Sequence, residues 1–489
     1  MHRMERATPN LQDPAIIWFR NDLRLQDNAA LVAASRHRAL VPVFIRETTS
    51  PARPLGAARR WWLHHSLARL AAALESLGTP LLRMSGNPAE LIADLVKATG
   101  ASAVYWNRRY DPAFQMADAA LKASLREDGL MAESFAGHLL HEPGRVRTGS
   151  GAHYKVYGPF WRALEPEVES RSPLPTPGSL APWPSISRLT SEPLDSWRLR
   201  PVKPDWSGGL AEAWTPGENG AHARLVDFLE NRIGGYADRR DIPGVDATSG
   251  LSPHLANGEI TPAQIFEALK TTGDDASPAD QSKFRKEIGW REFAWHLLAN
   301  EPALPERNHN RKFDRFPWRS DASALAAWQE GLTGYPVVDA GMRQLWQTGW
   351  MHNRVRMIVA SFLTKHLLID WRQGEDWFWD TLVDADPASN AASWQWVAGS
   401  GADAAPYFRI FNPVLQGENF DPDGSYVRHF VPELASMPAK FIHKPWSAPD
   451  PVLKAAGVRL GSNYPHPIVD HQLARDRALA AYQQIKEAA

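Results

Sequence analysis

The sequence predicts a mixed α/β protein, with a doubly wound parallel sheet in its N-terminal part and an all-α domain in its C-terminal part. Two observations support this fold class. Before residue 145, four short apolar runs alternate with helical patterns, and from about residue 217 onward the patterns are helical. Strands that alternate with helices form parallel sheets covered by helices on both faces, whereas continuous helical periodicity predicts a helical domain.

The expected strands are the apolar runs at residues 15–19, 39–45, 80–84 and 101–106. Between the second and third runs, residues 59–78 carry apolar side chains at helical spacing and end at a glycine, which is a typical helix stop. We therefore expect a Rossmann-like domain over residues 14–145. The chain reads RNDLRLQDN after the first run, so this domain lacks the glycine-rich turn that binds dinucleotides.

The middle of the chain reads as a connector. Nine prolines fall between Pro166 and Pro204, and such a density favours a stiff surface segment over a folded domain. We assign residues 146–216 to this connector and residues 217–485 to the helical domain.

Composition excludes several kinds of chemistry. The 489 residues include no cysteine, so disulfides, thiolate nucleophiles and cysteine-ligated metals are absent. The formal net charge of −1 indicates no overall attraction to a polyanion, although a local basic patch remains compatible with it. No apolar run approaches the length of a membrane span, and we expect a cytoplasmic monomer.

Residues 384–413 stand out because they combine acids, an amide and aromatic side chains with many small residues. Small residues leave room that core packing would normally fill with Leu, Ile or Val, so the segment is typical of a pocket for a large, flat ligand. Tryptophan is also enriched: 21 are present, and eleven lie between Trp290 and Trp396. No histidine lies at ligand spacing from Asp384 and Asp386, so we expect no metal there.

Three other segments could contribute to such a pocket. The hydroxyls of Thr248–Ser252 suit a phosphate, with a simple helix cap as the alternative. Glu287, Trp290 and Arg291 share one helix face, where the alternative is a surface ion pair beside a core tryptophan. Asn353 and Met357 share another face, flanked by arginines. Amides, guanidinium groups and indoles in one helical domain favour a planar ligand and a stacked base.

Taken together, these residues resemble the DNA photolyase/cryptochrome family, most closely its microbial cyclobutane pyrimidine dimer photolyases. The resemblance runs from WFRNDLRLQDN through TSGLS, KEIGWREF and WMHNRVRM to WQWVAGSGADAAPYFRIFNP, and it covers nearly the whole chain. These strings are long, rich in rare residues and in the order of the family.

The resemblance implies an FAD bound in the helical domain and active in its reduced form, FADH⁻. Asn390 would face the flavin N5 atom, and Arg356 with Asp384 would form a salt bridge over the flavin ring. Phe284 stands where several relatives carry tryptophan. The implied FAD-binding residues are Tyr236, Thr248, Ser249, Gly250, Leu251, Ser252, Phe284, Arg291, Asn353, Arg356, Asp384, Asp386 and Asn390.

The resemblance also implies UV-damaged DNA as the partner, with a flipped-out pyrimidine dimer as the substrate. Trp290 and Trp396 would form apolar walls, and a buried Glu287 with a raised pKa would donate a hydrogen bond to the dimer. The implied lesion-binding residues are Arg240, Glu287, Trp290, Asn353, Arg354, Met357 and Trp396. A basic rim of Arg240, Arg354 and the loop 307–319 would bind the DNA backbone.

The implied activity is a light-driven carbon–carbon lyase reaction, in which an electron passes from the excited reduced flavin to the dimer and then returns. Trp394, Trp371 and Trp318 match the chain of tryptophans that reduces oxidised flavin in this family. With Glu287 and Asn390 they complete the set of implied catalytic residues.

Some alternatives stay open at this stage. A cryptochrome photoreceptor and a (6-4) photolyase share the family, but (6-4) enzymes carry histidines where this chain has Asn353 and Met357. A dark flavin oxidoreductase is disfavoured because no nicotinamide site is visible. For the antenna chromophore we expect methenyltetrahydrofolate, although Ala113 and Phe114 replace residues of one folate-binding branch. A deazaflavin or no antenna are the alternatives.

Overall fold

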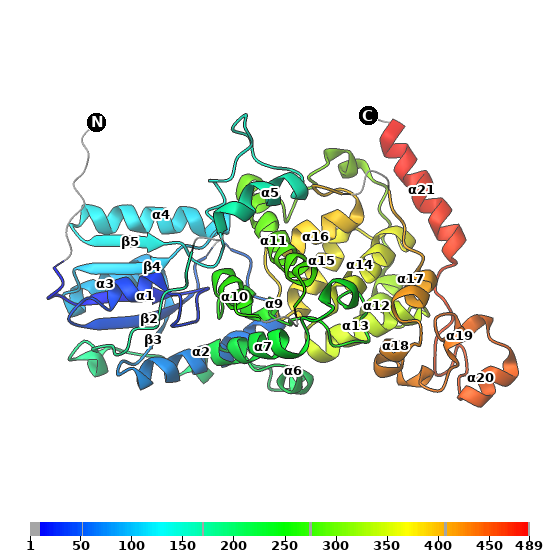
Figure 1. Cartoon of the computed structure of the whole chain (residues 1–489), viewed down its shortest axis with the longest axis horizontal. Coiled ribbons are helices and arrows are strands. Elements are labelled where there is room, and N and C mark those ends of the chain that lie inside the picture. The colour runs from blue at the N-terminus through cyan, green and yellow to red at the C-terminus, as the bar shows by residue number, and fades with distance from the viewer. Residues whose placement is uncertain (1–9, 51, 169–170, 273–275, 405–407, 488–489) are drawn as a thin grey trace.

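The computed structural model describes residues 10–50, 52–168, 171–272, 276–404 and 408–487. Its N-terminal part is a five-stranded parallel sheet in the order β3-β2-β1-β4-β5 (Figure 1). The strands are β1 (Ala15–Phe19), β2 (Leu40–Glu47), β3 (Leu82–Gly86), β4 (Ala103–Asn107) and β5 (Met131–Phe135). The helices between them are α1 (Ala29–Ala34), α2 (Ala57–Ser76), α3 (Pro88–Thr99) and α4 (Pro112–Glu127).

The central strand shows that both faces of the sheet are covered. Ile17 and Phe19 of β1 belong to a buried cluster with residues of α1 and α2. Ile16 and Trp18 point the other way and belong to a cluster with residues of α3 and α4. Because successive strand residues face opposite sides, this alternation confirms the predicted doubly wound arrangement.

The fifth strand is not predicted from the sequence. Its residues read MAESF, and Ala132 is the buried one among them. β5 pairs with β4 at the edge of the sheet, where fewer neighbours cover its side chains. An edge strand needs no continuous apolar run, so the pattern that identifies the other four strands is missing here.

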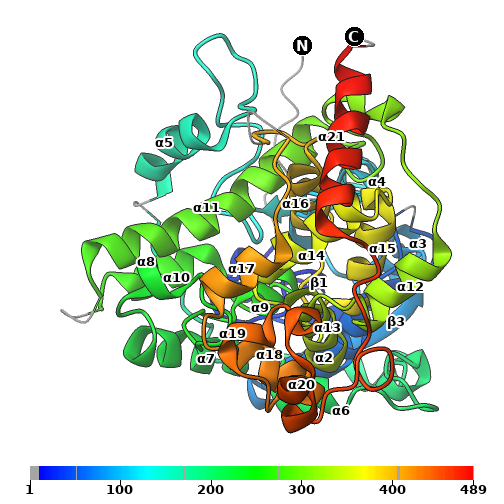
Figure 2. The same ribbon diagram turned by 90° about the vertical axis from the view of Figure 1, so that its right-hand side faces the viewer.

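The C-terminal part is helical, as predicted (Figures 1 and 2). Among the described helices, none combines the length and apolar content that crossing a membrane requires. The helices near the junction with the sheet are α7 (Glu218–Asn231), α8 (Tyr236–Arg239), α9 (Ser252–Ala256), α10 (Pro262–Leu269) and α11 (Pro278–Asn300). The others are α12 (Ala322–Glu330), α13 (Pro336–Thr348), α14 (Asn353–Ser361), α15 (Trp371–Thr381), α16 (Ser389–Ala398), α17 (Pro413–Phe420), α18 (Ser425–Phe430), α19 (Ala439–Ile442), α20 (Asp450–Ala456) and α21 (His471–Glu487).

The connector contains more structure than its proline content suggests. Helix α5 (Tyr157–Val168) packs Phe160 and Leu164 into the core beside α11, and α6 (Gly208–Ala213) follows later. From residue 171 to Pro204 the described chain forms short 3-10 turns and one isolated bridge, between Pro182 and Leu40 of β2, in addition to irregular backbone. The stiff surface segment is therefore shorter than the assigned range 146–216.

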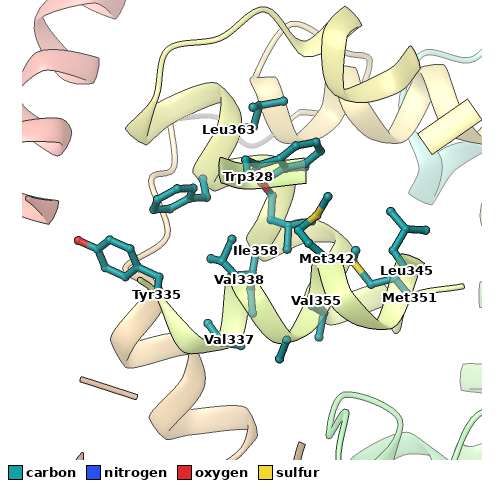
Figure 3. Close-up of a cluster of buried hydrophobic side chains, with 14 of the residues drawn as sticks. Trp328, Tyr335, Val337, Val338, Met342, Leu345, Met351, Val355, Ile358 and Leu363 are labelled. Atoms are coloured by element: carbon teal, nitrogen blue, oxygen red, sulfur yellow. The ribbon is translucent and has the colours of Figure 1, made fainter. Parts of the chain in front are cut away.

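The largest buried cluster lies around α13 and α14 (Figure 3). Trp328 is fully buried there, and its indole nitrogen donates a hydrogen bond to the carbonyl oxygen of Val359 at 3.0 Å. Burying this wide ring costs no hydrogen bond, because the polar atom finds a partner on the neighbouring helix. The cluster fixes α14, which carries several of the predicted site residues.

The two parts of the chain are joined by close backbone contact. Gly258 follows α9 with a φ of 68°, and a Cβ atom at this position would lie 1.9 Å from the carbonyl oxygen of Asn21, in the loop after β1. The guanidinium group of Arg24 in the same loop donates to the carbonyl oxygen of Gly258 at 3.0 Å. The junction therefore requires glycine for both its conformation and its space.

We expect Gly258→Ala to destabilise the protein by about 2 to 4 kcal/mol, because left-handed strain and a backbone clash add together. Gly457→Ala is the matched control, since Gly457 has a similar φ of 72° but nothing within 4 Å of the added Cβ. Its cost should be about 1 kcal/mol. Thermal unfolding midpoints measure both effects, and equal midpoints for the two variants would contradict the account of the junction.

Candidate functional site

The carboxylate of Asp384 ties together three elements of the site. Arg356 on α14 donates two hydrogen bonds to it, from Nη1 to Oδ1 at 3.1 Å and from Nη2 to Oδ2 at 2.8 Å. The hydroxyl of Ser252, at the start of α9, donates to Oδ2 at 2.6 Å. The buried Arg59 of α2 donates to the carbonyl oxygen of Ala385 at 2.8 Å. The predicted pair Arg356 and Asp384 is thus a bidentate ion pair at the junction of both parts.

The segment Thr248–Ser252 provides unused hydrogen-bond donors. Helix α9 begins without a side-chain cap, so the alternative of a simple helix cap is wrong. Within the described chain, the hydroxyl of Thr248 and the backbone N–H groups of Ser249 and Gly250 have no partner. Gly250 has a φ of 61°, which turns the backbone tightly. This donor set fits a phosphate or pyrophosphate group.

Asp386 and Asn390 start the next helix. One oxygen of Asp386 accepts hydrogen bonds from the backbone N–H groups of Ala388 at 3.0 Å and Ser389 at 2.7 Å. The side-chain nitrogen of Asn390 donates to the Oε1 atom of Glu375 at 2.6 Å. Since this nitrogen is engaged, the amide oxygen of Asn390 is the atom left to accept a hydrogen bond from a ligand.

Glu375 itself is a buried carboxyl that the sequence interpretation missed. Burial raises its pKa, and the nearby Arg53 partly offsets this effect. Nη1 of Arg53, which precedes α2, donates to Oε2 of Glu375 at 2.8 Å. The position of Asn390 therefore depends on a residue from the α/β part of the chain.

Three other residues of the predicted FAD site make contacts with neighbouring protein groups. Phe284 is buried and packs edge-on against Tyr236, with ring centroids 5.4 Å apart. Burial raises the pKa of Tyr236. Arg291 donates to the carbonyl oxygen of His138 at 3.0 Å and to Glu292 at 3.1 Å. Tyr236 and Phe284 share a buried cluster with Leu251, and Arg291 also donates to the carbonyl oxygen of Leu255 at 3.4 Å.

A second group of residues forms an acid–arginine network. Glu287 accepts a hydrogen bond from Arg240 at 3.0 Å, Arg240 contacts Asp241 at 3.2 Å, and Arg354 donates to Asp241 at 2.9 Å. The side chain of Glu287 is 24% exposed, so the expected burial is wrong. The reason is that α11 presents this residue on an open face beside Lys283.

Two of the predicted lesion-binding residues are indoles that are partly open to solvent. Trp290 is 37% exposed, and one side of its indole stacks on Tyr157 with centroids 3.8 Å apart. Trp396 is partly buried and donates its indole N–H to the carbonyl oxygen of Asp403 at 2.9 Å. Asn353 is exposed at the start of α14, and Met357 lies one turn later in a half-buried position. Each indole is therefore contacted by protein on one side.

Two of the three predicted redox tryptophans lie on neighbouring helices, Trp371 on α15 and Trp394 on α16, and Trp318 precedes α12. Trp371 is fully buried and donates to Asn308 at 2.9 Å, whereas Trp318 is partly exposed. Trp394 is buried, and a Cβ on Gly374 would lie 2.1 Å from its ring. Gly374 thus allows α15, which begins with Trp371, to approach α16 closely.

Part of the expected basic rim is neutralised by nearby acids, and part of it exposes cationic side chains. Arg240 and Arg354 are compensated by Asp241 and Glu287, as described above. The loop 307–319 does expose a group of cationic side chains, which are Arg307, Arg311, Lys312, Arg315 and Arg319. Ala405, Pro406 and Tyr407 of the segment 384–413 lie outside the described residues.

Several site residues were absent from the sequence interpretation. Asp241 adjoins the recognised Arg240, and Trp350, whose indole nitrogen donates to the hydroxyl of Ser252 at 3.2 Å, is the first residue of WMHNRVRM. Arg53, Glu375 and Tyr157 come from segments without any motif, and only the fold brings them to the site.

Comparison with known proteins identifies the family of this chain. Residues 15–178 match the family described as DNA photolyase, and residues 284–484 match the FAD binding domain of DNA photolyase. The chain belongs to the DNA photolyase/cryptochrome family.

Individual relatives span nearly the whole chain. A deoxyribodipyrimidine photo-lyase of Agrobacterium fabrum is 59% identical, over 97% of this chain and 98% of the relative. Cryptochrome-1 of Arabidopsis thaliana is 39% identical over 96% of this chain and 70% of the relative. A bacterial class III photolyase from Agrobacterium tumefaciens superimposes with a TM-score of 0.94 at 57% identity, covering 99% of this chain and 100% of that one.

We expect Asp384→Asn to lower both stability and flavin content. The substitution leaves the guanidinium of Arg356 without its counter-charge, which costs about 1 to 3 kcal/mol for a partly exposed partner. Flavin absorbance per mole of purified protein and the unfolding midpoint measure the two effects. Asp450→Asn, on the exposed start of α20, is the control. Flavin content and midpoint equal to those of the control would refute the role given to this ion pair.

Proposed function

We propose that this protein is a light-dependent DNA repair enzyme that splits cyclobutane pyrimidine dimers, a deoxyribodipyrimidine photo-lyase with FAD as its cofactor. The observation that carries the proposal is the combination, on one open face, of Glu287 in an ion pair with Arg240 and the exposed indole of Trp290. The relative from Agrobacterium fabrum bears the name of this activity and supports it.

The hydrogen-bond donors that are left free in the site indicate which residues would hold FAD. The free donors of Thr248–Ser252 would bind the pyrophosphate, and the ion pair of Arg356 and Asp384 would lie against the flavin. The amide oxygen of Asn390 would accept a hydrogen bond from a reduced ring, because Glu375 occupies the amide nitrogen. When bound and reduced, FAD supplies an electron upon absorbing light. Asp386 acts indirectly, by starting the helix that carries Asn390.

The open face would receive the dimer after it leaves the DNA stack. Trp290, backed by Tyr157, offers a flat surface, and stacking on such a ring contributes about 1 to 3 kcal/mol per base. Trp396 and Met357 would complete the apolar walls, with Asn353 and Arg354 at the edge. Glu287 would lie beside the dimer carbonyl, where negative charge develops, while Arg240 keeps the carboxyl in place. The exposed cations of the loop 307–319 would bind DNA phosphates.

Trp394, Trp371 and Trp318 would carry electrons inward when the flavin is oxidised. Two of them are buried and the third reaches the surface, as such a route requires. For the antenna we propose methenyltetrahydrofolate. Arg109 stacks over Phe114 at 3.7 Å in the region where the antenna is expected.

Substrate selectivity tests the proposed function against its alternatives. Reduced protein, illuminated with blue light, should restore an oligonucleotide that carries a thymine cyclobutane dimer and leave one with a (6-4) lesion unchanged. Restoration of the (6-4) lesion would identify the other repair class. Loss of neither lesion would favour a photoreceptor of the cryptochrome type.

Glu287→Ala should lower the light-driven repair rate while flavin content stays unchanged. A hydrogen bond to a charged group contributes about 1.5 to 3 kcal/mol, which corresponds to roughly 10- to 100-fold in rate. Glu267→Gln is the control, since Glu267 is an exposed acid on α10 that pairs only with Lys270 among the described residues. Unchanged repair in Glu287→Ala would exclude Glu287 from the reaction.

Trp394→Phe should block light-driven reduction of oxidised flavin and leave repair by chemically reduced protein intact. Trp295→Phe is the matched control, because Trp295 is also a buried indole whose nitrogen lacks a partner within the described chain. Transient absorption after a light pulse reports photoreduction, and dimer loss reports repair. Loss of both activities in Trp394→Phe would assign this residue a structural role only.

A further inference from the structure

The chain between β5 and α5 forms a loop that projects from the body of the molecule beside α5 (Figures 1 and 2). Its outer part, residues 144–155, reads GRVRTGSGAHYK and contains three arginine or lysine side chains and no acid. Arg145, Arg147 and Lys155 are exposed, and none of them forms an ion pair within the described chain. We name this segment the 144–155 loop. No residue of it belongs to the predicted flavin site, lesion site or basic rim.

Hydrogen bonds and packing hold the 144–155 loop in one shape. At its tip, the backbone N–H of Thr148 donates to the carbonyl oxygen of Ala152 at 2.9 Å. Val146 is 4% exposed and belongs to the buried cluster that contains residues of α5 and α11. Because Val146 points inward, its two neighbours, Arg145 and Arg147, face solvent. An ordered loop of this kind loses little conformational entropy when it binds a partner.

The base of the loop lies against the proposed lesion site. Tyr157 comes two residues after Lys155, and its ring stacks on the exposed indole of Trp290 with centroids 3.8 Å apart. The hydroxyl of Tyr157 donates to the carbonyl oxygen of Lys286 on α11 at 2.7 Å. The loop therefore leaves the body of the molecule at the edge of the face that is proposed to receive the dimer.

A single carboxylate joins the 144–155 loop to the loop 307–319, which exposes the other cationic side chains. Nε2 of His153 lies 3.5 Å from Oε1 of Glu301. Nδ1 of His309 lies 2.7 Å from Oε2 of the same side chain. The two cationic loops are therefore neighbours on one side of the lesion site.

The carboxylates close to the 144–155 loop lie at its base. Glu142 precedes the loop and pairs with Arg108 at 2.8 Å. Glu301 has the two histidine contacts, and Asp403 accepts a hydrogen bond from the backbone N–H of Tyr157 at 3.1 Å. The outer part of the loop contains no acid, so it carries a net positive charge. Exposed arginine and lysine side chains bind phosphate groups and release the counterions of a nucleic acid.

We propose that the 144–155 loop is an arm that binds the phosphate backbone of duplex DNA beside the flipped-out dimer. This inference rests on the proposed repair function and extends it from the lesion to the flanking duplex. DNA fits better than an acidic protein, because the arm adjoins both the lesion site and the cations of the loop 307–319. Backbone contacts carry no sequence information, so the arm adds affinity for any duplex, while the face around Trp290 selects the dimer.

Dark binding of a duplex that carries one thymine dimer, measured over a series of salt concentrations, tests the arm. The double variant Arg145→Gln, Arg147→Gln should bind this duplex at least tenfold more weakly than the unmodified protein. The slope of log affinity against log salt concentration should decrease in magnitude by about 2, because each lost phosphate contact removes about 0.9.

The double variant Arg36→Gln, Arg38→Gln is the matched control. Arg36 and Arg38 are also exposed arginines on either side of a buried residue, but they lie in the α/β part between α1 and β2. The control should bind the duplex with the affinity and salt slope of the unmodified protein. Equal affinity and slope in the two double variants would overturn the proposal.

A dinucleotide that consists of the dimer alone separates the arm from the repair function. Its light-driven repair should be the same in Arg145→Gln, Arg147→Gln and in the unmodified protein, because this substrate has no flanking duplex. Loss of this repair in the double variant at unchanged flavin content would place the loop in the lesion site and overturn the arm. If the unmodified protein repairs neither substrate, the proposed function fails, and dark binding of the duplex still decides whether the loop binds DNA.

Discussion

The site depends on one buried carboxylate, that of Asp384. It balances the charge of Arg356 and accepts a hydrogen bond from the hydroxyl of Ser252. The carbonyl oxygen of the next residue, Ala385, accepts a hydrogen bond from Arg59 of α2. Burying a charge without compensation costs several kcal/mol, so these partners cannot be moved independently. Helix α9, helix α14 and the segment between α15 and α16 thereby meet at fixed positions, and the contact with Arg59 joins the α/β part to the helical part. The pocket proposed for flavin is a consequence of this arrangement.

The sequence predicts most of the fold because burial leaves a clear pattern. Strands at residues 15–19 and 101–106 are covered on both faces, so they appear as continuous apolar runs. The edge strand at Met131–Phe135 lacks this constraint and escapes prediction. Helix α5 escapes for a different reason: it is close to a proline-rich stretch, but its apolar face packs against α11, and tertiary packing outweighs the local signal.

The site is predictable only in part, because motifs record neighbours in sequence and not in space. Asp384, Asn390 and Trp394 lie within one unusual segment and are found readily. Glu375 and Arg53, which orient Asn390, belong to no motif. The sequence predicts that Glu287 and Trp290 share one helix face, and both lie on α11, but the exposure of Glu287 depends on how α11 sits in the fold. The exposed fraction of a side chain and the identity of its hydrogen-bond partners can therefore be determined only from the structure.

We propose that this pocket and its open face together perform light-driven dimer repair. The most direct measurement follows a thymine dimer in a defined oligonucleotide, mixed with reduced FAD-loaded protein, in blue light and in darkness. The account predicts binding in both conditions and restoration of the thymines only in light. Restoration in darkness at the same rate, or none in light with flavin fully bound and reduced, would contradict it.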